Sequence, residues 1–195
     1  YLICWKYLGE PEIHVEFNPS SEFCEWFAKQ KTVGFNNRGY DNHILYARML
    51  GYDCYKLWQL SRDIVAGKDD VKFVNAYQIG FADILDYSSK KQSLKKWEIE
   101  LGIHHQEMGI PWDEPAPEDQ WDLVAEYCKN DVMATEAVFK ATYQDFVARE
   151  ILADLSGLKV INTTRQHTTK IIFGDDRNPN LVYTDLATGE RTDGT

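Results

Sequence analysis

The amino-acid sequence predicts an α/β fold, with a mixed sheet flanked by helices. Two segments rich in aromatic and β-branched residues, 1–8 and 12–17, lie on either side of the turn "GEPE" and are typical of strands. Segments with helix-capping residues and helical periodicity follow them along the chain. Strands that lead and helices that follow favour the α/β class. The chain has 195 residues, of which 44% are hydrophobic, so it can bury one sizeable core.

The stretch after these strands alternates helix and strand signals. Asn18 and Pro19 predict the start of a helix, because asparagine can cap a helix and proline suits its first turn. "KTVGF", residues 31–35, predicts a third strand. Another helix is expected over residues 40–50, with Gly51 ending it.

The middle of the chain is mainly helical in pattern. Residues 80–88 predict an extended segment, and a helix is predicted to begin after Ser93 and to end at Gly102. The longest predicted helix covers residues 119–149, with an apolar stripe that includes Tyr143. These segments supply the helices that should cover the sheet.

The composition changes after residue 155. Residues 156–195 are rich in Thr, Asn, Asp and Gly, which is typical of loops and connections. We therefore expect one domain over residues 1–155. Residues 156–195 are expected to be a linker or the start of a following module.

Charge and cysteine content limit the class of partner. The formal net charge is −10, which argues against a broad basic surface that grips duplex nucleic acid. A narrow cleft where metal ions meet phosphate is compatible with this charge. No run of residues is apolar and long enough to cross a bilayer, so no membrane partner is expected. The four cysteines form no Cys-x-x-Cys pair and are expected to be reduced core thiols of a cytoplasmic protein.

The stretch "GFNNRGYDNHIL", residues 34–45, places Asp41 at the start of a predicted helix. An acidic residue there can cap the helix or complement its positive end, which contributes less than about 1 kcal/mol. The alternative is that Asp41 faces a site and holds a cation. Asp83 and Asp86 could in turn lie in an outer shell around such a site, or could cap strand ends.

A second acidic position lies in the longest predicted helix. "YCKND" places Tyr127 and Asp131 at i and i+4, on one helical face with Cβ atoms about 5–6 Å apart. An aspartate beside an apolar stripe needs a paired charge or a metal ion. A hydroxyl one turn earlier could hold a water molecule against whatever the carboxylate coordinates.

These two motifs, Asn36-x3-Tyr40-Asp41 and Tyr127-x3-Asp131, resemble the second and third motifs of the DEDD superfamily of 3′→5′ exonucleases. The resemblance is to the tyrosine variant, found in proofreading domains of replicative, phage-type DNA polymerases. Between the motifs, "ADILDYSSKKQSLKKWEIELG" is similar to the family's Asp–Leu segment, its Ser-Leu-Lys helix and its Leu-Gly. The resemblance covers about residues 1–150. The later "NTTRQHTTKIIFG" is similar to the joint that leads into a polymerase module.

The resemblance implies a ribonuclease-H-like fold and hydrolysis of 3′-terminal nucleotides with two divalent ions, Mg²⁺ or Mn²⁺. It implies that Asp131 and Asp41 are metal ligands and that Tyr127 orients the attacking water. Asn36 would contact the terminal nucleotide. Tyr40 would pack behind the site or stack on a base, and Arg38 would contact a phosphate or cap the turn by pairing with Asp41.

One motif of the family is not seen in this sequence. The family's first motif, Asp-x-Glu, lies on the first strand of its sheet, whereas residues 1–8 look like the second strand. We therefore expect a sheet that lacks its first strand and a metal site of which this chain shows half. Such a chain could bind metal poorly and cut nothing.

Three functions follow from this interpretation. The leading one is the proofreading exonuclease domain of a DNA polymerase, whose partners are a single-stranded DNA 3′ end and a polymerase module of the same chain. It would work in the cytoplasm of a bacterial or phage-infected cell. The second is an RNA-trimming exonuclease of the ribonuclease D type. The third is a non-catalytic domain of the same fold that positions a nucleic-acid strand.

Overall fold

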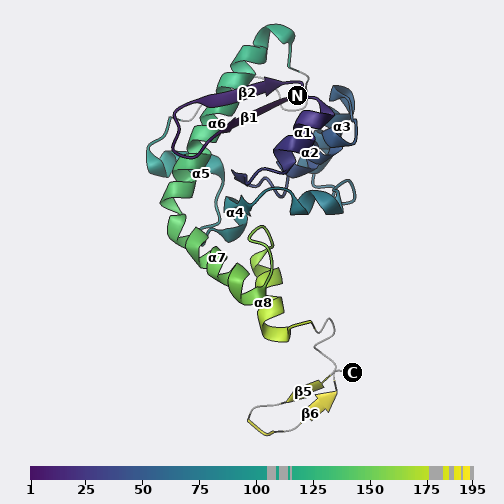
Figure 1. The fold of residues 1–195 in the computed structure, drawn as a ribbon, viewed down its shortest axis with the longest axis vertical. Helices are drawn as coiled ribbons and strands as arrows, with labels where there is room; N and C mark the ends of the chain where they lie inside the picture. Colours follow the sequence, from purple (N-terminus) through teal and green to yellow (C-terminus); the bar gives the residue numbers. More distant parts are fainter. Residues whose placement is uncertain are drawn as a thin grey trace.

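The computed structural model describes residues 1–104, 109, 114, 116–175, 182–184, 187–189 and 191–193. Within this part of the chain, short sheets and longer helices form a mixed α/β structure, which confirms the predicted class (Figure 1). The strands are β1 (Leu2–Lys6), β2 (Ile13–Phe17), β3 (Val33–Gly34), β4 (Ala82–Asp83), β5 (Val182–Thr184) and β6 (Arg191–Asp193). The α-helices are α1 (Ser21–Ala28), α2 (Asp41–Met49), α3 (Cys54–Val65), α4 (Ile84–Tyr87), α5 (Leu94–Leu101), α6 (Trp121–Ala141), α7 (Tyr143–Ser156) and α8 (Thr164–Phe173). Two 3₁₀ segments are η1 (Val74–Gln78) and η2 (Glu118–Gln120).

The described strands pair two by two. β1 and β2 are antiparallel, with Leu2 opposite Phe17, as their short connection requires. β3 and β4 are parallel, with Gly34 opposite Asp83, and β5 and β6 form an antiparallel hairpin beyond α8 (Figure 1). The predicted mixed sheet is therefore present as separate two-stranded sheets in the part of the chain described, with no pairing between β1–β2 and β3–β4.

The first helix begins later than its sequence predicts. Ser20 is its N-cap, and the Ser20 hydroxyl accepts a hydrogen bond from the backbone N–H of Phe23 at 3.2 Å. Asn18 has a positive φ of 45°, and its side-chain oxygen accepts a hydrogen bond from the amino group of Tyr1 at 3.1 Å. The prediction that Asn18 caps the helix is wrong because its side chain ties the end of β2 to the start of β1 instead.

The longest predicted helix is divided at Thr142. There the backbone leaves helical geometry, with φ −102° and ψ 18°, and α6 ends as α7 begins. The Thr142 hydroxyl donates to the Val138 carbonyl at 2.8 Å, a side-chain bond of the kind that bends helices. Tyr143 is 49% exposed, so it is not part of the buried stripe. No helix in the described part of the chain is both long and apolar enough to cross a membrane.

The extended segment predicted over residues 80–88 is shorter than expected. β4 ends at Asp83, whose carboxylate accepts a hydrogen bond from the Leu85 N–H at 3.0 Å and caps α4. Ser93 and Gly102 cap the two ends of α5 as predicted, and Gly102 has the left-handed φ of 67°. Cys54 is exposed, which corrects the expectation that every cysteine is a core thiol.

The main core lies between β4, α4, α5 and the junction of α6 with α7. Its buried residues are Ala82, Ile84, Tyr87, Trp97, Val138, Phe139 and Phe146. A second cluster joins α2 to α3, and a third joins β1 to α1 and α2. The N-terminal ends of α2 and α4 thus rest on packed apolar clusters.

Helix α8 packs along α7 (Figure 1). A capping box formed by Thr163 and Gln166 begins α8, and the buried His167 pairs through Nδ1 with the Ser156 hydroxyl at 2.7 Å. The buried Arg149 of α7 donates to the Asn162 carbonyl at 2.7 Å and so fixes the connection between the two helices. The predicted domain boundary between residues 155 and 156 stays a prediction.

Glu136 on α6 holds the β1–β2 hairpin. Its carboxylate pairs with Lys6 at the end of β1 and with Lys140, and it accepts a hydrogen bond from the Gly9 N–H at 3.2 Å. These partners, with Lys140 contributing most, lower the pKa of Glu136 from 4.5 to about 2. The Glu136 side chain is 11% exposed, whereas its partner Lys140 is 63% exposed, so solvent still reaches part of this cluster.

We expect Glu136→Gln to destabilise the fold by about 1–2 kcal/mol at pH 7, because solvent near this surface screens part of the interaction. The folded-state pKa is lowered, so this stabilisation is present above pH 4.5 and is lost as the pH falls towards 2. Urea denaturation at pH 7 and pH 3 measures the difference. Glu126→Gln is the matched control, because Glu126 pairs with Lys129 on the exposed face of the same helix. An equal loss of unfolding free energy in the two variants would contradict the conclusion that Glu136 stabilises the packing of the β1–β2 hairpin on α6.

Candidate functional site

The loop between β3 and α2 carries three of the predicted site residues in a tight turn. The Asn36 carbonyl accepts hydrogen bonds from the N–H groups of Gly39 and Tyr40 at 3.0 and 3.1 Å. Asn36 has a left-handed φ of 57°, which asparagine tolerates better than most residues. A Cβ atom at Gly39 would lie 2.5 Å from the Asn36 side-chain oxygen, so a larger residue there would displace the Asn36 side chain. This turn delivers Asp41 to the first position of α2.

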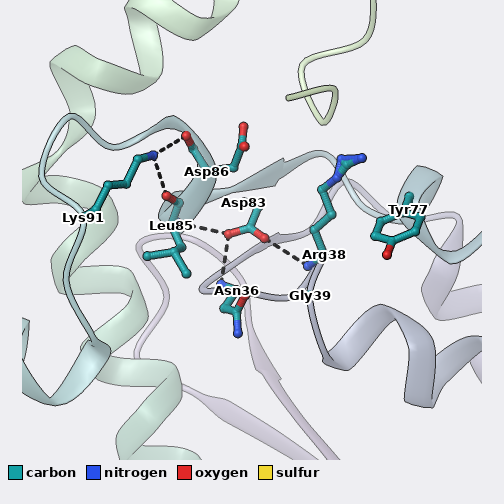
Figure 2. Close-up of a pocket in the computed structure, with 8 residues that line it drawn as sticks. All are labelled: Asn36, Arg38, Gly39, Tyr77, Asp83, Leu85, Asp86 and Lys91. Carbon is teal, nitrogen blue, oxygen red and sulfur yellow. Dashed lines mark hydrogen bonds between the residues drawn. The ribbon is translucent and has the colours of Figure 1, made fainter. Parts of the chain in front are cut away.

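Asp83 fixes the shape of this loop. Its Oδ1 accepts hydrogen bonds from the N–H groups of Asn36 at 2.9 Å and Leu85 at 3.0 Å, and its Oδ2 accepts one from the Arg38 N–H at 3.0 Å. Figure 2 shows the carboxylate between the two loops that it joins. Asp83 is 4% exposed, and burial raises its pKa while the three N–H donors lower it. Asp83 is therefore a buried connection between the loops as well as a cap.

Asp41 opens onto a pocket of about 550 Å³. Asn36, Tyr40 and Asp41 line one side of it, and Ser93 and Leu94 at the start of α5 line another. The pocket thus lies between the two segments that the resemblance singled out. Asn36, Tyr40 and Asp41 come from one short stretch of sequence and line the same pocket, and their role as a functional site stays a prediction.

Asp41 is accessible to solvent, but protein atoms surround its carboxyl group on several sides. The residue is open to solvent, but it lies in a concave part of the surface where protein replaces much of the water. This loss of solvation, together with the charge of Asp83, raises the pKa of Asp41 from 3.8 to about 6. A carboxylate that is destabilised in an open pocket is typical of a ligand-binding or catalytic position.

The pKa of Cys128 responds to charges from both acidic motifs. Cys128 is on α6, directly after Tyr127 and three residues before Asp131. Its pKa is raised by a hydrogen bond with the Cys4 thiol of β1, by burial, and by the charges of Asp131 and Asp41. The two aspartates therefore lie within electrostatic reach of one thiol, although they are ninety positions apart.

Tyr127 and Asp131 are half-buried on α6, and neither lines the pocket around Asp41. Tyr40 packs beside the cluster that joins α2 to α3, and its hydroxyl lies 2.7 Å from the Ser61 hydroxyl. Tyr40 also lines the pocket, so packing behind the site and stacking on a base both stay predictions. A direct meeting of Tyr127 or Asp131 with the pocket stays a prediction.

Arg38 lies in an adjoining groove of about 340 Å³, which is also lined by Tyr77, Asp86 and Lys91 (Figure 2). The Arg38 guanidinium lies over the Tyr77 ring at 4.9 Å, and within the described residues it makes no ion pair with Asp41. The alternative in which Arg38 caps the turn by pairing with Asp41 is therefore wrong. Tyr77 was not predicted as a site residue, because it belongs to no recognisable motif.

The donor set near Asp41 is small for a metal site. Among residues 1–104, 116–175 and the shorter described segments, no group of three or more His, Cys, Asp or Glu side chains is arranged to hold a metal ion. Magnesium can be bound by one or two carboxylates completed by water and substrate phosphate. Asp41 is compatible with that smaller set, and the participation of Asp131 stays a prediction.

No protein-family model matches this chain, and no significant match was found with a curated protein or with a solved structure.

We expect Asp83→Ala to destabilise the fold by about 2–4 kcal/mol, because three N–H groups lose a charged acceptor in a buried place. Urea denaturation gives the free energy of unfolding. The matched control is Asp53→Ala, which removes the N-cap of α3 alone and should cost about 1 kcal/mol. Equal losses would show that the bonds from Asp83 to the loop contribute nothing.

We expect Asp41→Asn to stabilise the protein by about 1 kcal/mol at pH 8 and to have little effect at pH 4. The folded-state pKa is raised, so folding favours the protonated form, and stability falls as the pH rises from 3.8 through about 6. The solvent exposure of the residue keeps the expected value small. Thermal denaturation of both proteins across this range measures it, and a variant that is less stable at pH 8 would contradict the raised pKa.

Proposed function

We propose that this chain is a 3′→5′ exonuclease domain with a ribonuclease-H-like fold, of the kind that proofreads for DNA polymerases. One observation carries the proposal: Asn36, Tyr40 and Asp41 line one open pocket together with Ser93 and Leu94 at the start of α5, and burial there raises the pKa of Asp41. The order of the two motifs along the sequence supports it.

The pocket has the chemistry to hold a terminal nucleotide. Phe35, Tyr40 and Leu94 give it apolar and aromatic surface for a base, and Asn36 adds an amide that can donate and accept hydrogen bonds. Lys91 adds a cation for phosphate. Because the pocket is open, a single strand can enter it without a duplex being gripped.

The side chains have distinct roles in the proposed reaction. Asp41 and Asp131 would hold the divalent ions, Mg²⁺ or Mn²⁺, which would supply stabilisation of charge on the attacking and leaving oxygens. The Tyr127 hydroxyl, one helical turn before Asp131, positions the attacking water. Asn36 and Tyr40 hold the terminal nucleotide, and the strand leaves past Arg38.

The arrangement of the elements is compatible with the proposed fold. The parallel β3 and β4 both lead directly into the segments that form the pocket, since β3 precedes the Asn36 loop and β4 precedes α4. In α/β proteins ligands are commonly bound at the carboxyl ends of parallel strands. A polymerase module in the same natural chain and a place in the cytoplasm are part of the proposal.

One observation favours a second candidate, a non-catalytic domain that positions a nucleic-acid strand. Within the described residues, fewer than three metal-binding side chains are grouped together. This alternative predicts that Mn²⁺ gives no binding signal in calorimetry with the natural chain that contains residues 1–195. The exonuclease proposal predicts binding that weakens about tenfold or more in Asp41→Asn.

We expect the natural chain that contains residues 1–195 to shorten a 5′-labelled single-stranded DNA from its 3′ end in the presence of Mg²⁺. Asp131→Asn should slow this reaction about 100-fold or more, because a group that acts in the transition state is lost. Gel analysis of the products over time measures the rate.

Asp122→Asn is the matched control for this experiment, because Asp122 is an exposed aspartate in the first turn of the same helix. It should leave the rate unchanged. No shortening, or equal rates for the Asp131 variant and the unchanged protein, would overturn the exonuclease assignment. Faster shortening of the matched RNA would favour the ribonuclease D type.

A further inference from the structure

The groove beside the Asp41 pocket is continuous with it. Asn36, Leu85 and Lys91 line both spaces, so a ligand that fills the pocket extends naturally into the groove. The groove has a volume of about 340 Å³, within the range of small-molecule sites. Its remaining walls come from Arg38 and Tyr77 on one side and from Asp86 above (Figure 2).

The charges around this groove favour an anion. The Asp86 carboxylate is paired with Arg149 at 2.8 Å, and the Asp83 oxygens are taken up by three backbone N–H groups. Arg38 and Lys91 also face the groove, but the Lys91 ammonium already donates to the Leu85 and Asp86 carbonyls (Figure 2). Arg38 makes no ion pair within the described part of the chain, so its guanidinium is the cation that an anionic group in the groove would meet.

The Arg38 guanidinium is held ready for such a ligand. It lies over the Tyr77 ring at 4.9 Å, and Nη1 donates a long hydrogen bond of 3.4 Å to the Ile161 carbonyl. The Tyr77 ring is itself held edge-on against His43, with centroids 4.8 Å apart. A planar guanidinium that is already positioned can bind phosphate oxygens through two N–H groups.

We infer that this groove binds the phosphodiester that precedes the scissile one, with Arg38 as its main contact. The inference rests on the proposed function, which places the last nucleotide of a strand in the Asp41 pocket. A 3′ terminus has a neighbour only on its 5′ side, so the linkage in the adjoining groove is the second from the end. The preferred ligand is therefore a strand of at least three nucleotides and not a free mononucleotide.

Neutral methylphosphonate linkages test this assignment without requiring catalysis. The probe is 5′-fluorescein-labelled (dT)₁₀ with one methylphosphonate at the first, second or third linkage from the 3′ end. Binding to the natural chain is measured by fluorescence anisotropy in EDTA, so that no strand is cut. The neutral second linkage should weaken binding about fivefold to tenfold, because Arg38 loses its charged partner.

The variant Arg38→Gln should remove this position-specific loss, leaving less than about a twofold effect. Arg62→Gln is the matched control, since the Arg62 guanidinium lies over Trp58 at 5.2 Å in a similar cation–π contact on α3, and it should keep the full loss. If Arg38→Gln does not fold by circular dichroism, Arg38→Met replaces it, because methionine keeps an aliphatic stem against Tyr77.

Two results would overturn the inference. One is binding that is indifferent to the charge of the second linkage. The other is the same loss in the Arg38 variant as in the unchanged protein. The binding experiment measures no cutting. A failure of the exonuclease proposal would therefore appear only in the Mg²⁺ experiment, and the binding result can be interpreted separately from it.

Discussion

The carboxylate of Asp83 accepts three backbone N–H groups, and the shape of the whole candidate site depends on these bonds. Two of the donors, Asn36 and Arg38, belong to the loop before α2, and the third, Leu85, begins α4. One buried charge therefore sets both walls of the groove and the direction in which Asp41 leaves the turn. The hydrogen-bond donors to this carboxylate are backbone N–H groups and not cations. The Arg38 guanidinium therefore remains available to bind a ligand. A carboxylate that is satisfied by backbone groups is well suited to organise a site without neutralising it.

The second constraint is the packing of the β1–β2 hairpin on α6. Glu136 fastens one end of this contact through Lys6, and the thiols of Cys4 and Cys128 meet further along it. This contact fixes the position of α6 relative to the hairpin, and Asp131 lies on α6. The packing of the hairpin therefore helps to determine where the Asp131 carboxylate lies. The hairpin is thus part of the architecture of the site, although in the described residues it contributes no side chain to either pocket.

Features that depend on near neighbours could be predicted from the sequence. The caps at Ser93 and Gly102 act within one helical turn, and the start of α2 at Asp41 follows from the turn before it. The break at Thr142 could not, because its hydroxyl could as well have pointed to solvent in a continuous helix. The groove around Arg38 also could not be predicted from the sequence, because it depends on a hydrogen bond between Asp83 and Arg38, which are 45 positions apart. Asp41 was predicted as a site residue from its motif, whereas its unusual carboxyl chemistry required the surrounding fold.

The link between Arg149 and Asp86 gives the C-terminal helices a mechanical connection to the groove. The same guanidinium holds the Asn162 carbonyl before α8, and the Ile161 carbonyl beside it receives Arg38. A force that pulls α8 away from α7 must therefore either break a buried ion pair or drag the wall of the groove with it. Displacement of α8 would therefore change the shape of the groove between Arg38 and Asp86.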